Sequence, residues 1–320
     1  MKYINKYDVN ISKIGLGTGR FGTRIEEEKS FEMLDLFIAG GGNLLDTARN
    51  YYEWVENGRG VSEKTIGRWL ESRKIRNKVY ISTKGGVRNQ GKKFIINLNK
   101  DNLVEELKES QDALMSKTVD FYLLHRDEPQ RPVEEIMETL QVICRQGNVR
   151  GLGVCNWSSE RIISANLYAN KHGYRPLTLI QTWWSIAEYT ETMWNDSTTT
   201  HMDKDTYDHI KQNNLVCMAY TSQAKGFFQK AIAEGLDNLD SFLKHRIATD
   251  VNIRRLNYIK KYCEENGLSP TAVINGYITS NQINGIALVS CSSINQLNDI
   301  INNCDSNIDS EFINYIEGIN

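Results

Sequence analysis

The stretch Val119-Asp120-Phe121-Tyr122-Leu123-Leu124-His125 carries the pattern that decides this fold. It is a short apolar run, too short for a helix, and a polar residue closes it. The run Val79-Tyr80-Ile81-Ser82-Thr83-Lys84 has the same form and closes on a lysine. After a turn segment, each run is followed by a stretch whose apolar residues recur at helical spacing. The pattern therefore predicts strands that alternate with helices.

This alternation extends along the whole chain. The predicted strands are Ser12–Leu16, Asn43–Leu45, Val79–Ser82, Asp120–Leu124, Gly151–Val154, Leu177–Ile180, Leu215–Ala219 and Gly285–Val289. The predicted helices are Glu26–Ala39, Ser62–Glu71 with Ser62 as N-cap, Asp101–Met115, Val133–Cys144, Ser158–Ala169, Asp203–Gln212, Val251–Asn266, Pro270–Asn281 and Ile294–Asn303. Because a helical crossover returns the chain to the same edge of a sheet, eight such strands imply parallel pairing.

Two α/β architectures fit parallel strands: an open doubly wound sheet and a closed (β/α)₈ TIM barrel. The first would require a dinucleotide fingerprint, and Gly17, Gly19 and Gly22 do match Gly-x-Gly-x-x-Gly. However, no amphipathic helix starts at these glycines, and no acidic residue follows about 20 residues later at a second strand end. The strand count, the chain length and the polar strand ends predict a single-domain (β/α)₈ barrel over residues 1–320.

Composition excludes several classes of function. With 320 residues and a formal charge of −2, the chain has no global field to recruit nucleic acid or an anionic membrane. We identify no signal peptide and no apolar run near the roughly 20 residues of a membrane span. The cysteines are scattered, with no Cys-x-x-Cys pair, which predicts reduced thiols in the cytoplasm and no metal site. They are Cys144, Cys155, Cys217, Cys263, Cys291 and Cys304.

Four polar residues stand at or just past predicted strand ends: Asp46, Tyr51, Lys84 and His125. In a parallel barrel these ends meet at one face, so the four side chains can form a proton-handling site. Each residue also has a simpler interpretation, because Asp46 can cap a turn, Lys84 can be solvated, and a tyrosine or histidine can be packing. Tyr52 directly follows Tyr51, and the spacing from Asp46 favours Tyr51.

Several motifs in one order resemble the aldo-keto reductase family. They are Ile14-Gly15-Leu16-Gly17-Thr18-Gly19, Gly42-Asn43-Leu44-Leu45-Asp46-Thr47-Ala48, Ile81-Ser82-Thr83-Lys84, Leu123-Leu124-His125-Arg126 and Val149-Arg150-Gly151-Leu152-Gly153-Val154-Cys155-Asn156. The resemblance implies a (β/α)₈ barrel that moves hydride, without metal, between NAD(P)H and an aldehyde or ketone. It implies that Tyr51 is the general acid, Lys84 lowers its pKa, Asp46 holds Lys84, and His125 orients the carbonyl oxygen.

The resemblance also implies a cofactor site across the barrel mouth. Asn156 and Gln181 would bind the nicotinamide carboxamide, and Tyr220 would stack on its ring. The remaining expected cofactor residues are Gly17, Thr18, Asp46, Ser222, Gln223, Lys225, Ser290, Ser292, Gln296 and Asp299. Members that prefer NADP usually carry a base in the last loop for the 2′-phosphate, yet residues 287–303 contain none. We expect NADP and leave NAD open. Cys155 stands where the family often has serine.

Aromatic residues are candidates for the substrate pocket: Phe21, Tyr52, Trp54, Trp157, Trp183, Trp184 and Trp194. Together with hydroxyls and amides they would suit a sugar or glycoside stacked on an indole face. The alternative is that several tryptophans pack between helices.

The function expected from the sequence is that of an NAD(P)-dependent oxidoreductase acting on a small-molecule carbonyl or alcohol. One alternative is a cofactor-binding sensor or auxiliary subunit without significant turnover. Another is a different barrel enzyme, whose paired carboxylates or metal triad we do not find. The oligomeric state stays open.

Overall fold

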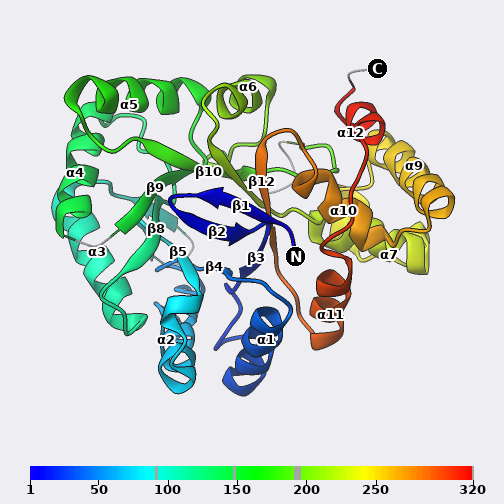
Figure 1. Cartoon of the computed structure of the whole chain (residues 1–320), viewed down its shortest axis with the longest axis horizontal. Helices are drawn as coiled ribbons and strands as arrows, with labels where there is room; N and C mark the ends of the chain where they lie inside the picture. The colour runs from blue at the N-terminus through cyan, green and yellow to red at the C-terminus, as the bar shows by residue number, and fades with distance from the viewer. Residues whose placement is uncertain (91–92, 147–148, 191–195, 319–320) are drawn as a thin grey trace.

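A computed structural model gives the fold for residues 1–90, 93–146, 149–190 and 196–318. Eight parallel strands form a closed barrel, in which β12 pairs with β3 and so completes the ring (Figure 1). They are β3 (Ile14–Gly17), β4 (Leu44–Asp46), β5 (Tyr80–Gly85), β8 (Val119–Leu124), β9 (Val149–Cys155), β10 (Leu177–Trp183), β11 (Val216–Tyr220) and β12 (Asn284–Val289). Closure confirms the predicted (β/α)₈ barrel and excludes the doubly wound sheet.

The side chains inside the barrel come from alternate positions of the strands, as the two-residue period of a strand requires. One interior cluster joins Leu44, Phe121, Leu123, Leu179 and Met218. Continuing the same alternation towards the carboxyl ends brings Asp46, Lys84 and Gln181 to the interior side, where they hydrogen-bond to one another. The strand period therefore delivers polar groups from separate strands to one end of the barrel.

Helices surround the barrel, and successive ones pack on each other. The outer ring consists of α1 (Glu27–Ala39), α2 (Val61–Arg73), α3 (Lys100–Ala113), α4 (Val133–Gln146), α5 (Ser159–His172), α6 (Lys204–Gln212), α10 (Pro270–Thr279) and α11 (Ile294–Asn303). Side-chain caps begin several of them, for example Ser158 on α5 and Asp203 on α6.

The predicted cap of α2 is wrong. The helix begins one residue earlier, after Gly60, whose φ of +68° is left-handed. The Ser62 hydroxyl is buried and donates to the carbonyl oxygen of Thr18 at 2.8 Å. Because a buried hydroxyl needs a partner, Ser62 joins the first two βα connections instead of capping its own helix.

Two β-hairpins in the structure were not predicted from the sequence. The first, β1 (Tyr3–Lys6) with β2 (Val9–Ser12), lies across the amino-terminal end of the barrel (Figure 1). Its Ile4 and Ile11 join the interior cluster, and Ser12 ends β2 rather than starting the first barrel strand. The second, β6 (Val87–Gln90) with β7 (Lys93–Ile96), follows β5.

The carboxyl-terminal half carries additional helices. Between β11 and α10 the chain forms α7 (Phe227–Glu234), α8 (Ser241–Arg246) and α9 (Asp250–Asn266). The last helix, α12 (Ser310–Glu317), packs on α9, where Tyr258 stacks on Phe312 and Tyr315. Short 3₁₀ turns occur at Arg76–Lys78, Ala224–Gly226 and Leu236–Asn238.

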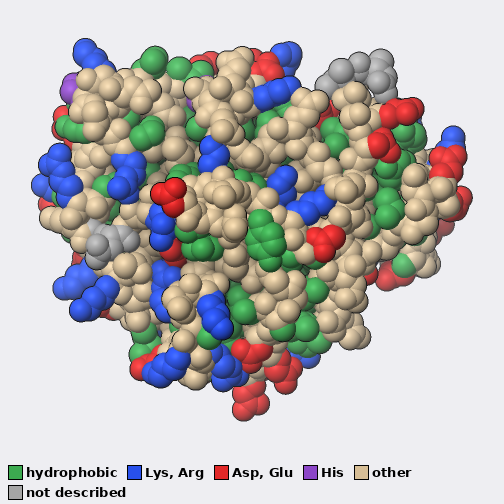
Figure 2. All heavy atoms as spheres, in the orientation of Figure 1, with side chains coloured by type: hydrophobic (Ala, Val, Ile, Leu, Met, Phe, Trp, Pro, Cys, Tyr) green, Lys and Arg blue, Asp and Glu red, His purple; other side chains and the backbone are tan. Residues whose placement is uncertain are grey.

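On the face shown in Figure 2, basic and acidic side chains are interspersed. Among the described residues, no helix combines the length and the apolar character needed to cross a membrane. All six cysteines are free.

Candidate active site

Lys84 is the centre of a buried polar cluster at the carboxyl end of the barrel. Its ammonium donates to Asp46 Oδ2 at 2.8 Å and to the hydroxyl of Tyr51 at 2.9 Å. A third bond runs to the carbonyl oxygen of Thr47 at 2.7 Å. Lys84 is fully buried and Asp46 is 3% exposed. The three donors of the ammonium are thus all used, and the geometry holds the phenol oxygen at a defined point.

His125 lies on the other side of Tyr51. Its ring meets the Tyr51 ring edge-on, with centroids 5.7 Å apart and an interplanar angle of 79°. Burial lowers the pKa of His125 well below its usual value, and the positive charges of Arg126 and Lys84 lower it further. The imidazole is therefore neutral at neutral pH and can donate one hydrogen bond without carrying a charge.

Burial and charge act in opposite directions on Tyr51. Burial raises the pKa of the phenol, the charge of Lys84 lowers it, and the Asp46 carboxylate raises it; the net pKa is about 12. Lys84 thus acts on the pKa of Tyr51 in the expected direction, but desolvation of the phenolate is the larger effect, and the net pKa lies above its usual value. Burial also lowers the pKa of Lys84, but Asp46 and Tyr51 outweigh it and raise the value overall, so Lys84 remains an ammonium.

A buried ion pair that the sequence did not reveal lies behind the connection from β4 to α2, residues 47–60, here called the Tyr51 loop. Arg49 Nη1 contacts Glu63 Oε2 at 3.0 Å, and Thr83 donates to the other Glu63 oxygen at 2.6 Å. The Arg49 amide donates to the carbonyl oxygen of Lys84 at 3.1 Å. A Cβ atom on Gly60 would lie 1.7 Å from Arg49 Nη1, so the guanidinium needs a glycine there. This network connects α2, the Tyr51 loop and β5. In the sequence, Arg49 and Glu63 look like ordinary surface charges, and only the folded structure shows that they are buried and paired.

Asn156, Gln181 and Tyr220 form a chain of hydrogen-bonded residues that reaches Asp46. Gln181 Nε2 donates to Asp46 Oδ1 at 3.0 Å. The Tyr220 hydroxyl donates to Asn156 Oδ1 at 2.7 Å, and the Thr200 amide reaches the same oxygen at 3.2 Å. The contact with Thr200 was missed, because residues 196–202 carry no periodic pattern.

Cys155 occupies the position where serine was expected. Its thiol is 1% exposed and lies 3.5 Å from Gln181 Oε1. Burial raises the pKa of the thiol to about 12, so the group stays protonated and can act as a weak donor to Gln181.

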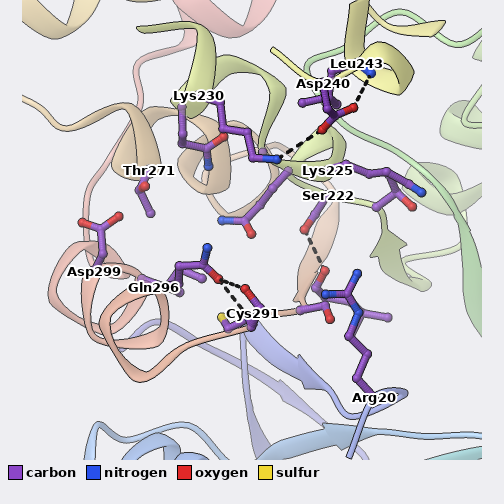
Figure 3. A pocket seen from close by; sticks show the side chains of 18 of the residues that line it. Arg20, Ser222, Lys225, Lys230, Asp240, Leu243, Thr271, Cys291, Gln296 and Asp299 are labelled. Atoms are coloured by element: carbon purple, nitrogen blue, oxygen red, sulfur yellow. Dashed lines mark hydrogen bonds and ion pairs between the residues drawn. The ribbon is translucent and has the colours of Figure 1, made fainter. Parts of the chain in front are cut away.

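The remaining predicted cofactor residues surround a cavity of about 610 Å³ next to the ends of β11 and β12, here called the β11–β12 cavity (Figure 3). Ser222, Gln223, Lys225, Ser290, Ser292, Gln296 and Asp299 all line it. Arg20 and Lys230 line it as well and were not predicted as cofactor residues. Gly17 and Thr18 lie outside this set. Thr18 Oγ1 contacts the carbonyl oxygen of Asp46 at 3.0 Å, beside the Lys84 cluster.

The donor set of this cavity fits a dinucleotide. Basic side chains reach it from the β3 and β11 sides, which suits a pyrophosphate. Gln229 lines the cavity, and its Oε1 is buried without a hydrogen-bond partner among the described residues. A bound ligand with a hydrogen-bond donor could satisfy this oxygen. In the last loop, Gln296 Oε1 already accepts from the backbone amide and the hydroxyl of Ser292, at 2.8 and 3.0 Å.

The predicted substrate aromatics fall into two groups. Phe21, Trp157 and Trp184 are 1–4% exposed and belong to the hydrophobic core, as does Trp183. Tyr52 and Trp54 lie on the loop beyond Tyr51 with ring centroids 4.9 Å apart, and Trp54 is 58% exposed. Trp194 lies outside the described residues. Of the predicted substrate aromatics that the structure describes, only Trp54 is exposed, and it follows Tyr51 by three residues. Among the described residues, no group of three or more His, Cys, Asp or Glu side chains could hold a metal ion.

Comparison with known proteins gives consistent matches along the chain. The sequence profile of the Aldo/keto reductase family matches residues 13–320. The Saccharomyces cerevisiae protein named "Putative aryl-alcohol dehydrogenase AAD14" is 27% identical over 323 residues, covering 96% of this chain and 81% of that relative. The aldo-keto reductase YhdN of Bacillus subtilis is 26% identical, covering 73% and 66% of the two chains. The norsolorinic acid reductase of Aspergillus flavus is 30% identical, covering 56% and 48%.

Proposed function

The chain belongs to the Aldo/keto reductase family, a family of carbonyl oxidoreductases, and we propose that it transfers hydride between a nicotinamide dinucleotide and an aldehyde or ketone. The observation that carries this proposal is the simultaneous contact of Lys84 with the Asp46 carboxylate and the Tyr51 hydroxyl. A buried phenol whose conjugate base would meet a buried ammonium is suited to give up one proton on demand.

The residues would share the work of proton transfer. A bound nicotinamide supplies the hydride that reaches the carbonyl carbon. Tyr51 gives its proton to the carbonyl oxygen, and the phenolate left behind is stabilised by Lys84. Asp46 keeps Lys84 charged in a dry site. His125, which is neutral, donates a hydrogen bond that orients the carbonyl oxygen.

Turnover with NADPH and NADH and a panel of carbonyl compounds tests the function. We expect oxidation of the reduced cofactor that depends on the added aldehyde. Cofactor binding, seen as a shift in NAD(P)H fluorescence, without turnover of any panel member would support the sensor alternative instead. Absence of both binding and turnover would contradict the proposal as a whole.

For the substrate, we propose aromatic aldehydes and the corresponding alcohols. Two observations support this class: a relative is named for aryl alcohols, and exposed aromatic side chains stand on the Tyr51 loop and on the β6–β7 hairpin that contacts it. Trp54 is 58% exposed, and Phe94 of the β6–β7 hairpin is 49% exposed and lies 6.0 Å from Arg126, next to His125.

A comparison of kcat/KM for benzaldehyde and for D-xylose tests the class, and the sugar prediction is upheld if the aldose is the better substrate. Trp54→Ala should reduce kcat/KM for benzaldehyde by about tenfold, the worth of one aromatic contact. Leu167→Ala, at a residue 65% exposed on α5, is the matched control and should change nothing.

We propose NADP as cofactor with NAD accepted. Arg20 and Lys225 support phosphate binding, whereas residues 287–303 offer no base for a 2′-phosphate. The Kd values of NADPH and NADH should therefore differ by much less than a thousandfold. A larger preference for NADPH would mean that a base from elsewhere reaches the 2′-phosphate. We also propose a cytoplasmic location, supported by the six free thiols.

A further inference from the structure

We propose that a second cavity, outside the barrel, binds a planar aromatic anion such as an aryl carboxylate or sulfonate. This cavity of about 820 Å³ lies between α6 and α10, with Trp183 and Trp184 at its inner side and α12 at its outer side, and is called the α6–α10 cavity below. It does not share its lining with the β11–β12 cavity. Its ligand is independent of the proposed reaction.

The cavity interrupts the outer ring of helices. Elsewhere successive helices pack directly, for example α4 on α5, α5 on α6 and α10 on α11. Between α6 and the segment directly after α10 the contact is polar and local: Tyr207 donates to Asn281 at 2.7 Å, and Lys211 donates to Gln282 at 2.5 Å. These bonds hold the two elements apart at a fixed distance, and the space between them has the volume of a small-molecule site.

Aromatic side chains line the space. Trp184 and Tyr277 meet edge-on with ring centroids 5.7 Å apart, and the indole donates to the tyrosine hydroxyl at 3.2 Å. Trp183 meets Tyr189 at 5.3 Å, and Tyr189 stacks on His201 at 4.2 Å. Flat faces and edges of this kind favour a flat aromatic ligand.

Arg255 supplies the charge that selects an anion. It projects from α9 into the cavity wall and is half-buried, and burial lowers its pKa. Its two terminal nitrogens donate to the carbonyl oxygens of Ile186 and Ile316, each at 2.8 Å. Among the described residues no carboxylate lies within ion-pair distance of this guanidinium. Tyr277 and Glu188 offset the effect of burial on this pKa only in part, so an anionic group of a ligand would supply the direct partner that the guanidinium lacks.

The acidic side chains that line the α6–α10 cavity already have hydrogen-bond or ion-pair partners within the protein. Glu317 accepts from Asn281 at 2.9 Å and from Tyr277 at 3.4 Å. Asp203 accepts from the backbone amide of Thr206 as the cap of α6. Glu188 accepts from the Thr249 hydroxyl at 3.1 Å, and Asp208 pairs with Lys204.

One further donor on the lining has no partner. Trp183 is 3% exposed, and its Nε1 is buried without a hydrogen-bond acceptor among the described residues. An indole N–H usually finds an acceptor when buried, and a ligand oxygen would supply one. Among the described residues the guanidinium has no carboxylate partner and the indole has no acceptor, and together they indicate a ligand with oxygen acceptors on an aromatic frame.

A pair of fluorescent probes that differ by one anionic group tests the proposal. 8-Anilinonaphthalene-1-sulfonate carries a sulfonate, and N-phenyl-1-naphthylamine has the same aromatic frame without it. Both are titrated into the full chain in the presence of excess NADPH. Loss of a charge-assisted hydrogen bond should raise the sulfonate's Kd about tenfold in Arg255→Met, with less than about a twofold change for the neutral probe.

Arg254→Met is the matched control, because Arg254 is the exposed neighbour on the same helix and is not part of the lining. It should leave both titrations unchanged. Arg255→Lys keeps the charge and should bind the sulfonate more tightly than Arg255→Met, which separates charge recognition from a folding defect. Equal sulfonate affinity in wild type and Arg255→Met, or complete displacement of the sulfonate by NADPH, would overturn the proposal.

Discussion

The two ends of the proposed active site, the buried cluster around Lys84 and the β11–β12 cavity, are built very differently. At the proton-handling end, Lys84 is fully buried and all its donors are used by Asp46, Thr47 and Tyr51. At the β11–β12 cavity, the ion pair between Lys230 and Asp240 is long, at 3.7 Å, and the two side chains are 43% and 57% exposed. Asp46 and Lys84 of the first set stand on short barrel strands, whereas Lys230 lies on α7 and Asp240 caps α8, outside the barrel strands. Substitutions should therefore have large, specific effects at the first end and modest effects at the second.

The largest effect is expected at Tyr51. Tyr51→Phe removes the proton donor and keeps the ring, so turnover should fall by about 10²- to 10⁴-fold, while the Kd of the cofactor stays nearly constant. Steady-state kinetics and NADPH fluorescence titration measure the two quantities. Tyr52→Phe is the control and should retain turnover. If the two variants behave in the opposite way, the neighbouring tyrosine is the acid.

Next comes the ion pair behind the loop. Glu63→Gln removes the buried carboxylate from Arg49, which keeps only the partly exposed Glu109 at 3.1 Å, so the free energy of unfolding should fall by about 2–3 kcal/mol. Glu27→Gln, which breaks an exposed pair with Arg68, should cost no more than about 1 kcal/mol. Urea unfolding of both variants measures the difference. Equal losses would mean that the buried network contributes no more than a surface pair.

His125 should make stability depend on pH. Its folded pKa lies well below its unfolded value, so its contribution is complete above about pH 6.5 and declines as the pH falls below that point. The slope is at most about 1.4 kcal/mol per pH unit. Unfolding of wild type and His125→Gln between neutral and acidic pH isolates this contribution. A constant difference between the two across the range would show that His125 protonates freely in the folded state.

The smallest effect of a substitution is expected at the β11–β12 cavity. If the cavity holds the dinucleotide phosphates, Lys225→Met should raise the Kd of NADPH about five- to tenfold, and the loss should shrink at high salt. Lys204→Met, at an 85% exposed lysine on α6, is the control and should leave the Kd unchanged. An unchanged Kd in Lys225→Met would remove this lysine from the cofactor site. A loss above about a hundredfold would erase the contrast between the two ends.

Much of the fold followed from periodicity. All eight barrel strands and eight ring helices were expected near their observed positions, because each buries one face and so repeats its apolar residues regularly. The predicted helix Val251–Asn266 is α9, whereas the β6–β7 hairpin, α7, α8 and α12 were missed. Phe94 and Ile95 of that hairpin are exposed, so no buried face imposed an alternating pattern there. The site residues of strand ends were predicted for the same reason as the strands themselves.

The chain by itself determined which strands form and which polar residues terminate them, since both depend on neighbours along the sequence. Only the tertiary structure decided what those residues meet. The pairing of Glu63 with Arg49, the Thr200 amide on Asn156, and the net pKa of Tyr51 depend on distance and burial in three dimensions. The same holds for Arg255, which donates to Ile186 and Ile316 once α9, the segment after β10 and α12 come together, and which has no carboxylate partner within the described part of the chain.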